Sequence, residues 1–253
     1  MQRDILIAAI LLLIVSGCGG RKTLADYELS LDSIVADTAV SLNKSQGKAQ
    51  CSLHLNVKML QGPHTEMMND SVLRGGVLPA DYLSLTDEKL PPRQAVDSFI
   101  HRYVSDYRSF YGKVFDEEGD AGSAGLHYRV DTEVQMLRDG IIGYIAHISD
   151  QQGEQSLSYT RVQNLDAETG HPVHLSDLYD TDERQSLPQH IGMALASQLE
   201  FSDTIALREQ GYFVHTPFYA PDNYQVVADG VEFIFVPGEI ATRDKGEIRV
   251  KVE

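Results

Sequence analysis

The most regular feature of the chain is an alternation of apolar and polar positions in short runs. The apolar members of the first run are Leu53, Leu55, Val57 and Met59. A period of two places successive side chains on opposite faces, so this run predicts a half-buried β-strand. Similar patterns at 126–136, 141–148, 157–165, 224–228, 231–236 and 248–252 predict further strands. The dipeptides Asp139-Gly140 and Asp229-Gly230 favour tight hairpin turns between neighbouring runs.

Two stretches instead place apolar residues three and four positions apart, which is typical of a helix. The first begins at Pro91-Pro92 and continues to Phe110, and the second spans 185–200. A shorter helix is expected at 203–210, before Gly211. Hairpins together with segregated helices predict an α+β fold, with a mainly antiparallel sheet and two or three helices packed on it.

The pattern also divides the chain into regions. Residues 18–48 are polar with few large apolar side chains, and we expect a tether and linker there. We expect one α+β domain over 49–253, with a division into 49–166 and 167–253 as the alternative.

The N-terminus has the features of an export signal. Arg3 precedes the apolar run Ile5–Val15, which is too short to span a bilayer, and Val15-Ser16-Gly17-Cys18 resembles a bacterial lipobox. This predicts cleavage of residues 1–17 and lipidation of Cys18; the alternatives are an ordinary signal peptide or a buried helix. Since Gly19 is not acidic, we expect anchoring by palmitate and other acyl chains in the outer membrane, facing the periplasm.

Composition narrows the functional classes. The 253 residues are 42% hydrophobic, which supports a folded core, and the net charge is -16. A field of that sign repels phosphate backbones, so nucleic-acid binding is disfavoured. Once Cys18 is modified, Cys51 is the remaining thiol, and its place in an alternating run favours a small buried side chain over a reactive nucleophile.

Several clusters are candidate sites of chemistry. His171 and His174 have a metal-ligand spacing, but Pro172 spoils the geometry, so we expect no metal and no cofactor. The acidic segment Asp116–Asp120 lacks the alternating ligands of a calcium loop, and whether it binds calcium stays open. The cluster Asp177, Asp180, Asp182 and Glu183 fits partners of helix N-termini better than glycosidase carboxylates, which need one desolvated member.

An aromatic-rich stretch lies near the C-terminus. Its members are Tyr212, Phe213, Phe218, Tyr219 and Tyr224. Aromatic side chains on loops stack on sugars or anchor partners, which makes this stretch a candidate binding surface. The alternative is packing over the sheet.

The order of several short motifs resembles a known family. The motifs are Ala95–Ile100 with Tyr107-Arg108, Gln163–Gly170, Val173–Tyr179, and Asp229–Phe235 with Gly246. Together they resemble the paired domains of unknown function found in the extracellular part of the lysozyme-sensing anti-sigma factor and ahead of a peptidoglycan deacetylase domain. The resemblance covers about residues 49–253. It departs from the family at Gln151–Ser156, where relatives often carry a Gly-Gly-Ala-His element.

The shared turn has a structural explanation. Gly170 tolerates a positive φ, while Asp166 and Thr169 accept hydrogen bonds from free backbone N–H groups. Asp177 is placed to cap a short helix.

These observations predict a non-enzymatic, lipid-anchored envelope protein that binds a protein or a glycan. The resemblance and the acidic charge together favour a cationic muramidase such as lysozyme as partner, and a peptidoglycan fragment is the other candidate ligand. The alternative function is a cell-wall glycan-processing enzyme or its accessory module.

Overall fold

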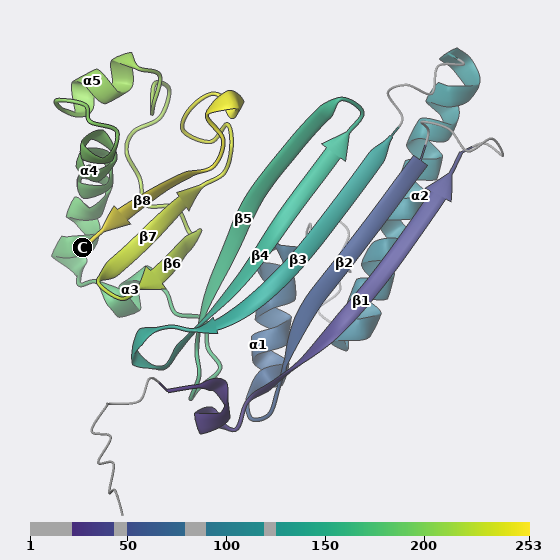
Figure 1. The fold of residues 1–253 in the computed structure, drawn as a ribbon, viewed down its shortest axis with the longest axis horizontal. Helices are drawn as coiled ribbons and strands as arrows, with labels where there is room; N and C mark the ends of the chain where they lie inside the picture. Colours follow the sequence, from purple (N-terminus) through teal and green to yellow (C-terminus); the bar gives the residue numbers. More distant parts are fainter. Residues whose placement is uncertain (1–21, 43–49, 79–89, 119–124) are drawn as a thin grey trace, which may run out of the picture.

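The protein is described by a computed structural model that covers residues 22–42, 50–78, 90–118 and 125–253, with side chains omitted at 113–118. The fold is α+β, as predicted, and contains two sheets (Figure 1). No helix within the described residues is long and apolar enough to cross a membrane.

The larger sheet has five strands in the order β1-β2-β3-β4-β5. Its strands are β1 (Ser30–Ser41), β2 (Gln50–Gln61), β3 (Leu126–Met136), β4 (Ile141–Gln152) and β5 (Gln155–Asp166). All neighbours are antiparallel except β2 and β3, which run parallel. At the predicted hairpin between β3 and β4, Asp139 and Gly140 have φ of 54° and 76°.

A parallel pair needs a long crossover connection, and here helices supply it. Between β2 and β3 lie α1 (Thr65–Val72), a π-helical turn (Leu73–Val77) and α2 (Pro92–Glu118). Both helices lie behind the sheet in Figure 1 and cover one of its faces. The apolar positions of the alternating runs point to this side and form the first core, with Leu55, Phe99 and Tyr144 fully buried.

Strand β1 corrects the expectation that residues 18–48 are only a tether and linker. Ser30–Ser41 pairs with β2 along its whole length, from Ser30 opposite Gln61 to Ser41 opposite Gln50. The sequence pattern is weak because β1 is an edge strand, and its inward side chains, such as Ala36 and Val40, are small or only half-buried.

The second unit follows β5. It contains α3 (Leu175–Leu178), α4 (Thr181–Gln198), α5 (Thr204–Glu209) and the sheet β6 (Tyr224–Val227), β7 (Gly230–Phe235) and β8 (Ile248–Val252). The helices pack on this sheet around a second core that includes Ile191, Leu195 and Phe235.

The second sheet also reaches the exposed face of the first. Ile234 of β7 packs against Ile145 and Val162, which lie on the face of the large sheet opposite the helices. The β4–β5 part of that face is therefore partly covered, whereas among the described residues this contact does not extend over β1–β3.

Candidate functional site

The open face of the large sheet carries polar side chains from three neighbouring strands. It consists of the residues that alternate, along each strand, with the apolar residues of the first core. Its central members are Ser52, His54 and Asn56 of β2, His127, Arg129 and Asp131 of β3, and His147, Ser149 and Gln151 of β4. The strand register places them in neighbouring rows, with Ser52 beside His127 and His54 beside Arg129. We refer to this set as the open polar face.

Two shallow cavities lie on this face. One has a volume of about 570 Å³ and extends from β1 to β4, and the other, of about 350 Å³, lies between β3 and β5. Arg129 and Ser149 line both cavities, so the two adjoin. Glu247 of the second unit lines the smaller cavity and accepts a hydrogen bond from the backbone N–H of Thr160.

A chain of polar side chains runs along the two cavities, with Asp37 and His54 in the larger one, Asp131 in the smaller one and Arg129 in both. The His54 ring contacts the Asp37 carboxylate through Nδ1 at 2.6 Å and the Asp131 carboxylate through Nε2 at 3.7 Å. Asp131 in turn accepts a hydrogen bond of 2.6 Å from Nε of Arg129. The Arg129 side chain remains 59% exposed, so its guanidinium still faces solvent. The arrangement presents fixed donors and acceptors from three strands to a ligand.

A serine–histidine pair lies at one end of the same face. Ser52 Oγ and His127 Nδ1 share a hydrogen bond of 2.6 Å. A nucleophilic serine also needs preorganised donors for the developing oxyanion. Ser52 lies inside β2 between Ala39 of β1 and His127 of β3, where backbone N–H groups belong to the sheet ladder. The geometry therefore favours a hydrogen-bonding role for Ser52 over acyl transfer.

The aromatic stretch proposed as a binding surface is mostly in the second core. Tyr212, Phe213 and Tyr224 are 8%, 0% and 5% exposed. Phe213 makes edge-to-face contacts with Phe218 and Phe235, at ring-centroid distances of 4.9 and 5.6 Å.

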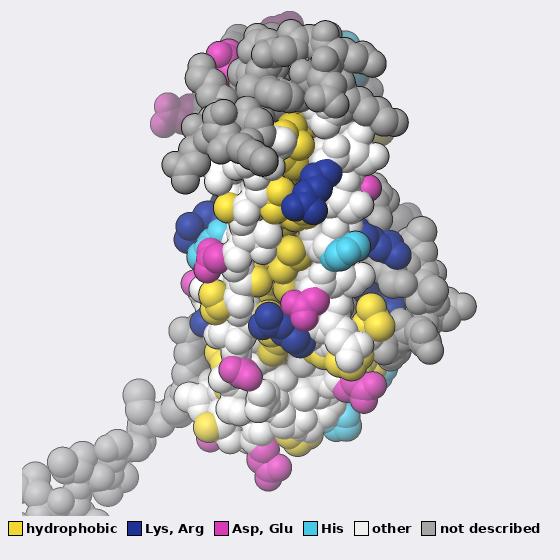
Figure 2. Space-filling view, turned by 90° about the vertical axis from the view of Figure 1, so that its right-hand side faces the viewer, with side chains coloured by type: hydrophobic (Ala, Val, Ile, Leu, Met, Phe, Trp, Pro, Cys, Tyr) yellow, Lys and Arg dark blue, Asp and Glu magenta, His cyan; other side chains and the backbone are white. Residues whose placement is uncertain are grey.

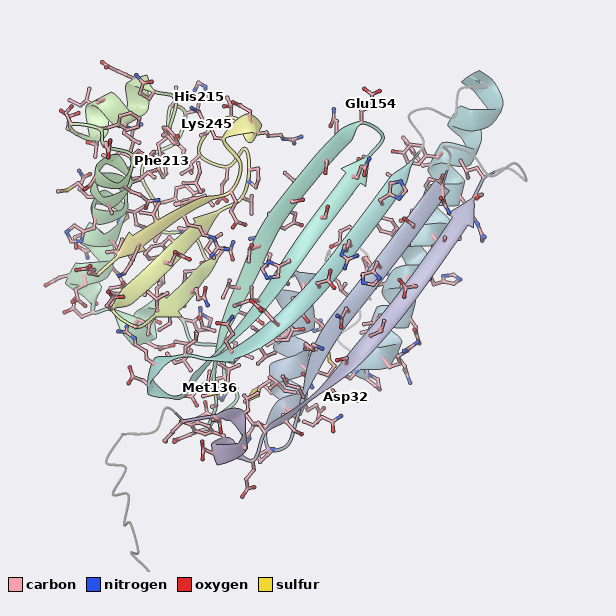
Figure 3. The ribbon with its side chains drawn as sticks, in the orientation of Figure 1. Asp32, Met136, Glu154, Phe213, His215 and Lys245 are labelled. Carbon is pink, nitrogen blue, oxygen red and sulfur yellow. The ribbon has the colours of Figure 1, made fainter. Side chains whose placement is uncertain are left out.

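The hydroxyl group of Tyr224 donates to the Val173 carbonyl at 2.6 Å, and that of Tyr219 donates to the Glu239 carboxylate at 2.6 Å. Figure 3 labels Phe213, His215 and Lys245 at the same end of the second unit. The packing interpretation therefore holds for these residues, and we place no binding surface on them.

The turn after β5 has the predicted geometry. The Asp166 carboxylate accepts hydrogen bonds from the backbone N–H groups of Glu168 and Thr169, at 3.0 and 2.7 Å, and from the Thr169 hydroxyl. Gly170 has φ of +77° and donates its N–H to the Asp166 carbonyl. Partial burial opposes ionisation of Asp166, but these hydrogen bonds prevail and lower its pKa. The motif is therefore structural.

The predicted helix-capping carboxylates also act as caps. Asp177 accepts from the N–H of His174 at 2.8 Å, before α3. Asp180 accepts from the N–H groups of Asp182 and Glu183, while Glu183 accepts from the N–H of Asp180. This reciprocal capping box explains why α4 begins at Thr181, four residues before the predicted start.

Other predicted features stay separate from the open polar face. His171 and His174 are exposed, and within the described residues no group of three or more metal-ligating side chains converges. The side chains of Asp116–Asp120 and the whole of residues 1–21, Cys18 included, lie outside the described part of the chain. Cys51 is fully buried, and burial raises the pKa of its thiol to about 11, as expected of an inert side chain.

The open polar face was not predicted, although its residues can be located in the alternating runs of the sequence. His54, Arg129 and His147 occupy the polar positions of predicted strands, where solvent-exposed residues of any kind are tolerated. They form a site because the sheet pairs strands that lie some 75 residues apart in the sequence. This pairing brings Ser52 beside His127. That pairing is a property of the fold and is not visible in the alternation.

Comparisons with known proteins bear on the fold. No family model and no curated protein matches the sequence. Among solved structures, a member of the DUF3298 family from Bacteroides fragilis has a TM-score of 0.76 at 19% identity. A DUF3298 family protein from Pseudomonas aeruginosa has a TM-score of 0.56 at 12% identity. Each alignment covers 88% of this chain and 90% of the other.

The protein has a DUF3298-like fold. The DUF3298 neighbours represent a domain of unknown function, so the likeness extends to architecture and not to a ligand. The further links to a lysozyme-sensing anti-sigma factor and to a deacetylase remain predictions from the sequence motifs.

Proposed function

We propose that this protein is a non-enzymatic, lipid-anchored protein of the bacterial cell envelope that binds a peptidoglycan fragment on its open polar face. The lipobox-like segment ending at Cys18 supports the anchor and the outer-membrane location. The observation that carries the binding function is the ordered chain Asp37–His54–Asp131–Arg129, whose members line the two adjoining cavities.

The chemistry of this face fits a wall fragment. Sugars present many hydroxyl groups, which pair with hydroxyl, amide and imidazole groups such as those of Ser52, Asn56 and His127. Muramic acid and its stem peptide also carry carboxylates, and the exposed guanidinium of Arg129 offers a bidentate partner to one of them. Because the rows of side chains are already ordered by the sheet, little conformational entropy is lost on binding.

The alternative of a glycan-processing enzyme requires one carboxyl group in a desolvated pocket. The carboxylates on either side of His54 are solvated instead, with Asp37 70% and Asp131 33% exposed. This supports binding without bond cleavage.

The experiment is a calorimetric titration of the purified protein with a soluble disaccharide-tetrapeptide from peptidoglycan. Arg129→Ala and His54→Ala should each weaken binding by about tenfold or more, the equivalent of at least one lost charged hydrogen bond. Arg184→Ala on α4 is the matched control and should bind like the wild type. Equal affinity in all four proteins, or no binding by the wild type, would contradict the proposal. Cleavage of the fragment during the titration, followed by mass spectrometry, would instead favour the enzyme.

A second candidate ligand is a basic muramidase such as lysozyme, and the observation that favours it is the net charge of -16. Attraction of this kind is long-ranged and screened by salt. We expect lysozyme to be captured at about 20 mM salt and released as the Debye length shortens, at about 300 mM. Failure of capture at low salt removes this candidate and leaves the glycan proposal standing.

A further inference from the structure

The smaller cavity of the open polar face is built by both units of the protein. Arg129 lies on β3 of the large sheet, whereas Glu247 directly precedes β8 in the second unit. Arg129 pairs with Asp131 on its own strand at 2.6 Å. Glu247 pairs with Arg249 of β8 at 2.9 Å. The cavity therefore has a guanidinium from one unit and a carboxylate from the other in its lining.

The guanidinium of Arg129 has donors to offer a ligand. An arginine side chain has five N–H donors, and among the described residues Asp131 engages only the one on Nε. Asp131 also faces the ring of His54, so its charge is shared between two partners. The side chain of Arg129 is 59% exposed. Its terminal N–H groups are therefore available for charge-assisted hydrogen bonds to a carboxylate.

The carboxylate of Glu247 retains acceptor capacity. One oxygen accepts from the backbone N–H of Thr160, and the other accepts from Nε of Arg249. A carboxylate has about four lone-pair sites, so these two bonds leave about half of them unused. Arg249 also pairs with Glu232 at 2.8 Å, so one guanidinium balances two carboxylates. The second unit therefore brings surplus negative charge to this wall of the cavity, where Glu247 is 18% exposed.

Charges at the opposite edge of the large sheet are distributed differently. Figure 2 shows the side of the molecule where β1 and α2 lie, with acidic and basic side chains at scattered points beside an apolar strip. On α2, Arg93 and Asp97 pair directly with each other, at 3.2 Å. The smaller cavity differs, because its arginine and its glutamate come from separate units and each keeps hydrogen-bonding capacity for a ligand.

The volume of the smaller cavity suits a single small group. At about 350 Å³, it lies at the low end of the range found for ligand sites. The larger cavity, of about 570 Å³, adjoins it and carries the hydroxyl and imidazole groups that suit a sugar. The smaller cavity is therefore placed to receive one end of a ligand whose sugar lies on the larger one.

A group that matches this lining carries an ammonium and a carboxylate close together. The free end of an amino acid has both on one carbon. In a peptidoglycan fragment, the stem peptide provides such an end when its diamino acid, meso-diaminopimelate, is not cross-linked to another stem. Cross-linking converts the ammonium into an uncharged amide, which removes the cation that a carboxylate would bind.

We propose that the smaller cavity binds the free amino-acid end of an uncross-linked stem peptide, with its carboxylate on Arg129 and its ammonium on Glu247. This inference rests on the peptidoglycan-binding function proposed above and makes that function selective for uncross-linked wall. From β1 to β5, the two cavities extend over four strand spacings, about 19 Å. Three extended residues span at most about 11 Å, which leaves room for a sugar ring on the larger cavity.

The test compares two forms of one ligand on the purified full protein. The probes are the disaccharide-tetrapeptide that contains meso-diaminopimelate, and the same fragment acetylated on the free amine of that residue. In calorimetric titrations, the wild type should bind the free amine at least about tenfold more tightly, because acetylation removes a charge-assisted hydrogen bond. Glu247→Gln keeps an acceptor for the Thr160 N–H and should reduce this preference to less than about threefold.

Two further variants serve as controls. Glu232→Gln is the matched one, because Glu232 also pairs with Arg249 and lies outside the lining of the smaller cavity. It should keep the preference of the wild type. Arg129→Ala should weaken binding of both forms alike, since both carry the carboxylate. Circular dichroism and thermal midpoints check that all three variants are folded.

The possible outcomes separate this inference from the proposed function. Equal affinity of the wild type for the two forms, or a full preference that survives in Glu247→Gln, would overturn the inference. Loss of the preference in Glu232→Gln would also overturn it, because the effect would then follow from Arg249. In each of these cases, weaker binding of both forms by Arg129→Ala would still support the proposed function. No binding of either form to the wild type would overturn both.

Discussion

Asn164 of β5 and Asn223, which precedes β6, each hydrogen-bond to the backbone of the other's sheet. The Asn164 amide donates to the Tyr224 carbonyl at 2.7 Å, and the Asn223 amide donates to the Thr160 carbonyl at 2.8 Å. The side-chain oxygen of Asn223 also accepts from the N–H of Val162 at 2.9 Å. Both side chains are buried, so these bonds are shielded from competition by water. They join two units that have separate cores.

These hydrogen bonds between the two units predict that the units unfold cooperatively. Asn223→Ala leaves the Val162 N–H without a partner in the interior, and we expect a loss of about 1–3 kcal/mol in the free energy of unfolding. Asn164→Ala should cost a similar amount, because it removes the partner of the Tyr224 carbonyl. Gln189→Ala on the exposed side of α4 is the control and should change stability little.

Urea denaturation followed by circular dichroism provides the measurement. The wild type should unfold in one transition, because the two units are linked by buried hydrogen bonds and by the Ile145–Val162–Ile234 contact. Two well-separated transitions in the wild type, or unchanged midpoints in both asparagine variants, would contradict this coupling of the two units.

The turn at Asp166 predicts a dependence of stability on acid. Although partial burial opposes its charge, hydrogen bonds from Thr169 and Glu168 hold the pKa of Asp166 below its usual range. A carboxyl group with a lowered pKa stabilises the fold above its unfolded value, near pH 4, and that contribution is lost as the pH falls through the folded value. Asp166→Asn keeps an acceptor for the turn and removes the titration.

We therefore expect stability to depend on pH with different slopes in the wild type and in Asp166→Asn. Below about pH 4, the stability of the wild type should fall more steeply than that of Asp166→Asn. The measurement is the thermal midpoint at a series of pH values, compared between the two proteins. Parallel curves would show that the hydrogen bonds to Asp166 do not favour its charged form.

Much of the fold followed from local pattern. The sequence predicted which side of the run Leu53–Met59 is buried, because burial on one face requires alternating apolar residues. It also predicted the turn at Asp166–Gly170, because a positive φ there favours glycine. Strand β1 was missed because an edge strand with one half-buried side, such as that of Ile34 and Ala36, needs no strong apolar alternation.

The site was less predictable than the fold. The aromatic residues around Phe213 suggested a binding surface because of their type, yet large aromatic side chains serve a small core equally well. The open polar face depends on which strands become neighbours. His54 and Asp131 are 77 positions apart in the sequence and meet only in the sheet.

The buried thiol of Cys51 should be unreactive in the native protein. With a pKa of about 11, it carries roughly a few hundred times less thiolate at neutral pH than an ordinary cysteine. In a Cys18→Ala variant, Cys51 is the one thiol left, since the sequence has two cysteines. Its reaction with a disulfide reagent should be slow in native buffer and rapid in urea. A rapid native reaction would show that the thiol is accessible, which the β2–α2 packing does not allow.

Lipidation of Cys18 predicts that the variants Cys18→Ala and Cys51→Ala differ in lipid labelling and in the cell fraction where they are found. Cells given labelled palmitate should incorporate the label into the wild type and into Cys51→Ala, and not into Cys18→Ala. Two or three acyl chains give stable anchoring where a single chain binds only marginally, so loss of the lipid should move Cys18→Ala into the soluble envelope fraction. Cys51→Ala is a matched control because it removes a thiol without touching the N-terminal segment. Label retained by Cys18→Ala, together with unchanged membrane partitioning, would contradict the lipobox interpretation and favour a different form of export or anchoring.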